Sequence, residues 1–201
     1  MAKNYNPEIA DAVRNFLDED DWHYSFDSEN GLFRFGVNLP GKMKNVQYVV
    51  GINERDYNVY AISPLSADQD DPEQMRQMAE FVCRANYGLR DGNFEMDFND
   101  GELRYKCYMN CNGAIPTKNM VGGSIHCPAA MFKRYSKGIL QILFAGMSAV
   151  DAIELCEGTP AAPASDSRDE EETSSRLMDI LRRLQSGHGS SEDEMPAASG
   201  E

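Results

Sequence analysis

The order of hydrophobic and polar residues predicts a helix at the start of the chain. Asn6 followed by Pro7 is typical of an N-cap with proline at the first helical position. Apolar residues then recur at helical spacing, at Ile9, Val13, Phe16 and Leu17. The acidic cluster 18–21 would meet the negative end of the helix dipole, so we expect the helix to end there.

Two later turn signals predict β-hairpins. Asn30-Gly31 is a preferred two-residue turn, and it would pair Phe26 with Phe35 and Asp27 with Arg34. The paired residues place apolar side chains on one face and opposite charges on the other, so turn and faces select the same register.

Asp100-Gly101 predicts a second hairpin by the same reasoning. Its register would pair Met96 with Tyr105 and Glu95 with Lys106. Between the hairpins, the runs 46–52 and 57–62 are apolar on both faces, which indicates two more strands in the middle of a sheet.

A second helix is expected from Asp71-Pro72, a cap followed by proline, with Gln74 able to complete a capping box. Its apolar stripe would contain Met75, Met78, Ala79, Val82 and Ala85, with Cys83 on the same side. A third, long helix is expected from Pro128, after a flexible turn at Gly122-Gly123. Gly146 would end it, and a short helical turn capped by Ser148 would follow.

These elements predict an α+β fold, an antiparallel sheet of about five to six strands flanked by helices in the order α-ββββ-α-ββ-α. We assign this domain to residues 1–156. From Glu157 the composition changes to Pro, Ala, Ser and acidic residues, which predicts a disordered acidic tail over 157–201. Within it, residues 174–186 have the pattern of a short amphipathic helix, with apolar residues at Leu177, Ile180, Leu181 and Leu184.

The net charge of -14 argues against nucleic acid and anionic lipid as partners, because both are negatively charged. No signal peptide is recognisable, and the apolar run 138–150 is shorter than the roughly 20 residues that span a bilayer. The five cysteines form no disulfide framework. We therefore expect a cytoplasmic protein with reduced thiols.

The residues that could carry chemistry do not form a recognisable site. Cys107 and Cys111 lie four apart on a strand, about 13 Å, too far to share a zinc ion. Adjacent His126 and Cys127 should point in different directions, so no Cys-His nucleophile is expected. The run 97–101 partly matches a calcium-binding loop, but its glycine is at the wrong position and a hairpin explains it better. We expect no catalytic residue, metal or cofactor.

Two features point to a protein or peptide partner. The third helix is apolar on a second side, at Leu140 and Phe144, and this surplus would pack either against a second subunit in a homodimer or within the same domain. The tail residues Leu177, Ile180, Leu181 and Leu184 would either dock in an apolar groove or form an idle helix of marginal length. These six residues are the candidate partner interface.

The residues Asn86-Tyr87-Gly88, Gly92 to Asp97 and Asp100 to Lys106 resemble the YbjN-type bacterial domains, which are described as sensory-transduction regulators. The later Ile115-Pro116-Thr117 and the spacing from Tyr135 to Ile153 are also similar, so the resemblance covers roughly residues 5–155. It implies a fold like that of type III secretion chaperones, often homodimeric, in a bacterial cytoplasmic protein without catalytic residues. The long acidic tail and the glycines near Gly122 depart from the family pattern.

Three hypotheses about function follow. The first is a chaperone-like or regulatory module that binds a peptide of another protein through a sheet edge or an apolar groove. The second is a small-ligand sensor or an enzyme that uses a pocket between sheet and helices. The third makes the tail autoinhibitory, with its apolar residues covering the domain's own groove.

Overall fold

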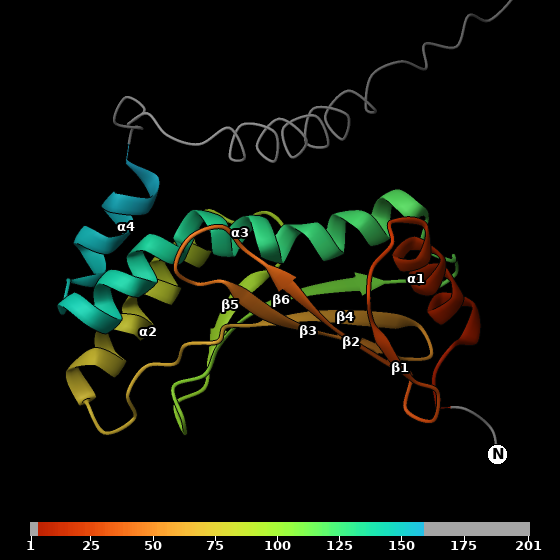
Figure 1. Cartoon of the computed structure of the whole chain (residues 1–201), viewed down its shortest axis with the longest axis horizontal. Helices are drawn as coiled ribbons and strands as arrows, with labels where there is room; N and C mark the ends of the chain where they lie inside the picture. The colour runs from red at the N-terminus through yellow and green to blue at the C-terminus, as the bar shows by residue number, and fades with distance from the viewer. Residues whose placement is uncertain (1–3, 159–201) are drawn as a thin grey trace, which may run out of the picture. The chain divides into compact units, whose positions relative to one another are not determined.

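The computed structural model describes residues 4–158, and this part of the chain forms four helices and six strands (Figure 1). The helices are α1 (Pro7–Glu19), α2 (Pro72–Asn86), α3 (Lys118–Ala145) and α4 (Ala149–Glu157). The strands are β1 (Ser25–Asp27), β2 (Leu32–Asn38), β3 (Asn45–Ile52), β4 (Asp56–Ile62), β5 (Asn93–Met96) and β6 (Leu103–Asn110). The predicted α+β class with an antiparallel sheet is confirmed.

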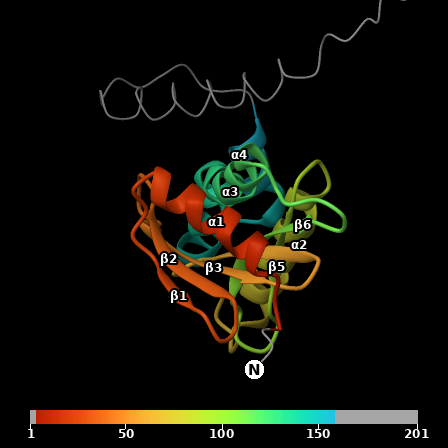
Figure 2. The ribbon, with the colours of Figure 1, turned by 90° about the vertical axis from the view of Figure 1, so that its right-hand side faces the viewer.

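The six strands form one antiparallel sheet in the order β1-β2-β3-β4-β6-β5. The strands β3 and β4 lie in the middle, as their two apolar faces predict. The sheet curves around α1 and α3, while α2 and α4 pack at the end of the sheet near β5 (Figures 1 and 2). Alternate strand residues such as Phe33, Tyr48, Val59 and Tyr105 are fully buried beneath the helices.

Asparagine and aspartate caps begin α1 and α2 where the sequence predicts. The side chain of Asn6 accepts hydrogen bonds from the amides of Glu8 and Ile9, and Asp71 caps α2 in the same way. The expected capping box of α2 is wrong, because the Gln74 side chain accepts from the amide of Asp68 instead.

The predicted registers of both hairpins are wrong by two residues. Phe26 pairs with Phe33, and Phe94 pairs with Tyr105. Each loop has four residues rather than two, because an aspartate before it accepts hydrogen bonds from loop amides and a glycine with positive φ closes it. The loops are Asp27-Ser28-Glu29-Asn30-Gly31 and Asp97-Phe98-Asn99-Asp100-Gly101, counted with their leading aspartates. A shift of two keeps the same faces inward, so Phe35 and Tyr105 are buried and Phe26 and Met96 pack half-buried against the core.

The long helix α3 begins ten residues before Pro128, at Lys118, and runs through Gly122 and Gly123. The predicted flexible turn is therefore wrong. A Cβ atom on Gly122 would lie 2.9 Å from the Phe16 ring of α1, so glycine is what allows α1 and α3 to approach closely here. The helix ends where expected, because Gly146 adopts the left-handed conformation that favours glycine. Ser148 caps α4 as predicted.

The predicted burial of Cys83 is also wrong, since this residue is exposed on α2. The buried stripe of α2 consists of Met75, Met78, Phe81 and Ala85. Within residues 4–158, no helix combines the length and the hydropathy that a membrane span requires.

Candidate functional site

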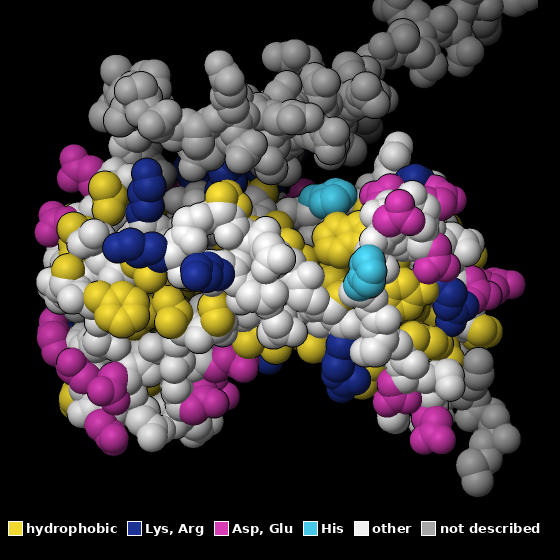
Figure 3. Space-filling model, viewed as in Figure 1, with side chains coloured by type: hydrophobic (Ala, Val, Ile, Leu, Met, Phe, Trp, Pro, Cys, Tyr) yellow, Lys and Arg dark blue, Asp and Glu magenta, His cyan; other side chains and the backbone are white. Residues whose placement is uncertain are grey.

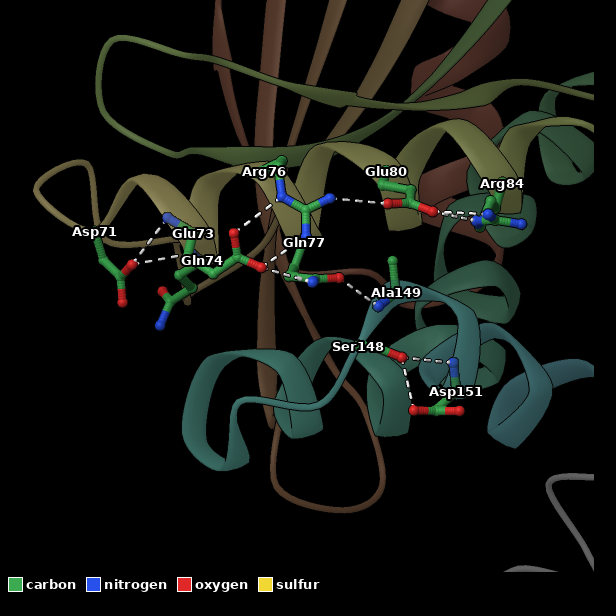
Figure 4. Close-up of polar contacts among 10 residues, drawn as sticks. All are labelled: Asp71, Glu73, Gln74, Arg76, Gln77, Glu80, Arg84, Ser148, Ala149 and Asp151. Carbon is green, nitrogen blue, oxygen red and sulfur yellow. Dashed lines mark hydrogen bonds and ion pairs between the residues drawn. The ribbon is translucent and has the colours of Figure 1, made fainter.

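The helices α2, α3 and α4 meet at a junction that side chains of α2 hold together. The Gln77 side chain accepts a hydrogen bond of 2.7 Å from the amide of Ala149, the first residue of α4, and donates one of 2.8 Å to Glu73 (Figure 4). The Gln74 side chain donates to the carbonyl of Leu143 in the last turn of α3, at 3.2 Å. Two glutamines thus satisfy backbone groups that helix ends leave without partners, and they fix the geometry of the junction.

Two adjoining depressions lie at this junction and share Gln74, Leu143 and Phe144. The larger has a volume of about 510 Å³ and extends to the loop before α2; the smaller has about 260 Å³ and extends to the turn between α3 and α4. We call the two together the Phe144 groove. Its lining residues are Leu65, Ser66, Ala67, Asp68, Gln69, Asp71, Glu73, Gln74, Gln77, Asp100, Ile142, Leu143, Phe144, Gly146 and Met147.

The side chain of Phe144 is the apolar centre of this groove and is 73% exposed. Leu143 and Met147 beside it are half-buried. Figure 3 shows hydrophobic side chains gathered on the surface over the C-terminal half of α3, with Lys and Arg side chains above them. An exposed phenylalanine between two depressions is the arrangement of an apolar anchor for a partner side chain.

The charged residues that line the groove are all acidic: Asp68, Asp71, Glu73 and Asp100. Glu73 forms an ion pair of 2.7 Å with Arg76, and hydrogen bonds from Arg76 and Gln77 lower the pKa of its carboxyl to about 2. The three aspartates have no ion pair within the described part of the chain. The groove therefore combines an apolar anchor with three carboxylates that have no ion pair within residues 4–158.

The structure separates the candidate interface residues. Phe144 lies in the groove, whereas Leu140, one turn earlier on α3, is half-buried and is not among the lining residues. The other four, Leu177, Ile180, Leu181 and Leu184, lie outside the described residues, as does the predicted helix over 174–186. Their role stays a prediction.

The histidine and cysteine side chains do not converge on one site. The His126 ring packs against the rings of Phe16 and Trp22, and burial lowers its pKa. The Cys127 thiol lies on another side, 3.6 Å from the carbonyl oxygen of Asp91. Within residues 4–158, no three histidine, cysteine or acidic side chains are placed to hold a metal ion.

Cys107 and Cys127 are the pair of thiols that the strand β6 and the helix α3 bring together. A hydrogen bond with Cys127 and burial raise the pKa of the Cys107 thiol, so it stays protonated. Both thiols pack beside Tyr105, whose hydroxyl donates to the carbonyl of Asp91. Cys107 is buried and Cys127 is half-buried in this arrangement, which fits the reduced structural thiols that the sequence predicts.

Sequence reasoning found Phe144 but missed the acidic lining of the groove. Asp68 comes from the loop before α2, and Asp100 comes from the β5–β6 turn. The two segments are joined by a hydrogen bond of 3.0 Å from the amide of Ala67 to the carbonyl of Gly101. A Cβ atom on Gly101 would lie 2.0 Å from the carbonyl oxygen of Ala67, so the contact requires glycine. The hydrophobic periodicity of a single helix or strand cannot predict such a contact, because the contact joins two different loops.

Comparison with known proteins gives one family and no curated relative. No curated protein matches the chain. A family model matches residues 10–141, which span β1 to β6, most of α1 and α3, and α2. The family is described as "Putative bacterial sensory transduction regulator". Because the match covers well over half of the chain, this protein belongs to the YbjN family.

Proposed function

We propose that this chain is a non-enzymatic regulatory module, chaperone-like in fold, that binds a segment of a protein partner in the Phe144 groove. The observation that carries the proposal is the 73% exposure of Phe144 between two depressions, on a frame that Gln74 and Gln77 fix. A preorganised apolar anchor loses little conformational freedom when a partner binds. The description of the family as regulators supports the same function.

The groove is a better docking site than the edges of the sheet. The edge strands β1 and β5 have only three and four residues. A partner strand added to such an edge would form few backbone hydrogen bonds. We therefore infer a side-chain interaction in the groove rather than the addition of a strand.

The alternative function is a small-ligand sensor or an enzyme with a pocket between sheet and helices. The depressions at Phe144 lie at the ends of α2 and α3 and beside loops, not between the sheet and the helices. The proposal also includes a chaperone-like role in the bacterial cytoplasm and assembly as a homodimer. Both agree with the resemblance of the sequence to YbjN-type domains.

Affinity purification with matched variants tests the proposed function. Phe144→Ser removes the anchor, whereas Tyr87→Ser removes a side chain that is 97% exposed at the other end of α2. We expect proteins that bind the wild type and Tyr87→Ser, identified by mass spectrometry, to be lost from Phe144→Ser. Retention of the same proteins by Phe144→Ser would show that the groove is not the binding site.

A further inference from the structure

Residues 174–186 differ in charge from the rest of the tail. From Glu157 onward the chain has eleven acidic and four basic residues. Three of the four basic residues fall inside the segment, against one acidic residue, Asp179; they are Arg176, Arg182 and Arg183. A run of four acidic residues, 169–172, stands immediately before it. The chain thus passes from a strongly acidic run to a basic segment with an apolar stripe.

The charges on the surface of α3 are complementary to this pattern: basic side chains come first and acidic side chains follow. The helix α4 ends at Glu157, which forms an ion pair of 3.8 Å with Arg134 of α3. The neighbouring Lys133 and Lys137 have no ion pair within residues 4–158. Further along α3 comes Phe144, in the groove lined by carboxylates. From the end of α4, the surface therefore changes from basic to acidic and apolar.

The chain is long enough to bring the segment to the groove. Seventeen residues lie between Gly158 and Arg176, and they can span up to about 60 Å when extended. Phe144 lies ten positions after Arg134 on α3, about 15 Å along the helix axis. Linkers of this kind raise the effective concentration of a tethered segment to about 1 mM.

We propose that residues 174–186 of this chain bind in the Phe144 groove and compete there with the protein partner. The stripe Leu177, Ile180, Leu181 and Leu184 supplies the apolar contacts to Phe144 and Leu143. Arg182 and Arg183 supply positive charge to the aspartates of the groove, and the acidic run 169–172 supplies negative charge to Lys133 and Lys137. This inference rests on the proposed function, because it assigns the groove a regulator within the same chain.

A labelled synthetic peptide of residues 172–188 tests the competition. Its binding is measured by fluorescence anisotropy to the full-length chain and to the full-length double variant Leu177→Ser/Leu181→Ser, which leaves every groove residue in place. If the peptide binds the free groove with a Kd of about 100 μM, a tethered competitor at about 1 mM weakens its binding to the wild type by about tenfold. We expect the double variant to bind the peptide about ten times more tightly than the wild type.

Two further variants, made in the double-variant background, show where the peptide binds. Phe144→Ser should abolish binding. The matched Tyr87→Ser should leave it unchanged, because Tyr87 lies about 24 Å along the axis of α2 from the groove residue Asp71. A peptide with Arg182→Glu and Arg183→Glu should bind at least several times more weakly, and added salt should reduce this difference.

Three results would overturn the inference: equal affinity of the wild type and the double variant, absence of peptide binding to the double variant, or binding that survives Phe144→Ser. Self-association of the wild type that the double variant loses, measured by sedimentation, would place the segment on another copy and would also overturn it. The affinity purification gives an independent result. If Phe144→Ser loses its protein partners while the peptide fails to bind, only the inference about residues 174–186 fails.

Discussion

The pair Gly122 and Gly123 allows a sharp test of how α3 packs against α1. Both glycines lie inside the helix, so alanine at either position should stabilise it by about 1 kcal/mol relative to glycine. Gly123 has no heavy atom within 4 Å of an added Cβ, so Gly123→Ala should show this gain.

Gly122→Ala should lose the gain through a steric clash. Its Cβ would lie 2.9 Å from Cε2 of Phe16, and the Phe16 ring is itself held against His126 at a centroid distance of 5.8 Å. Overpacking of a buried site costs about 1–3 kcal/mol. We therefore expect Gly122→Ala to be less stable than Gly123→Ala by about 1–3 kcal/mol.

Urea unfolding of the two variants and the wild type, followed by circular dichroism, measures this difference. The control is built in, because both substitutions add the same methyl group to the same helix. Equal stability of the two variants would refute the reasoning, since it would mean that the residues around Gly122 and Gly123 do not pack as one helix against α1.

The remaining predictions concern other parts of the described domain. Gln77→Ala should lower the free energy of unfolding by about 1–3 kcal/mol in urea, because the amide of Ala149 loses its partner in a part-buried position; a smaller loss would mean that water replaces the glutamine. Burial raises the pKa of Tyr57 to about 12, so the folded state prefers the protonated phenol. The contribution of this group to the free energy of unfolding is complete below about pH 10, the pKa of tyrosine in the unfolded chain, and is lost between about pH 10 and 12. Tyr57→Phe should therefore reduce the loss of stability over this pH range, measured by urea unfolding. An unchanged loss would contradict the assignment. Exposed Cys83 should react with iodoacetamide in the native protein before buried Cys107, as peptide mass spectrometry would show, and equal labelling rates would contradict their burial.

The sequence predicts most of the architecture because its signals are local. Caps such as Asn6 and Asp71 and the apolar alternation of the strands depend on neighbouring residues, and both were correct. The hairpin registers were wrong because two-residue turns compete with longer loops that an aspartate can stabilise. In the first hairpin the deciding residue, Asp27, is the one that the predicted register pairs with Arg34.

The error at Gly122 has a different cause. Glycine is unfavourable in a helix when helix propensity alone is considered, and a pair of glycines is typical of a turn. Here the close approach of Phe16, 106 residues earlier in the sequence, favours glycine inside α3. The acidic lining of the groove depends on similarly distant contacts, whereas the exposure of Phe144 follows from the position of one residue on one helix.

The unbroken length of α3 has a consequence for how this domain opens. Its first turns pack on Phe16 of α1, and at Gly138 it packs against Phe81 of α2 and Cys156 of α4. In between, it lies on β4 and β6 (Figure 1). Neither end of the domain can open without breaking contacts of α3. Amide hydrogen exchange along α3 should therefore follow global unfolding rather than local fraying of the helix.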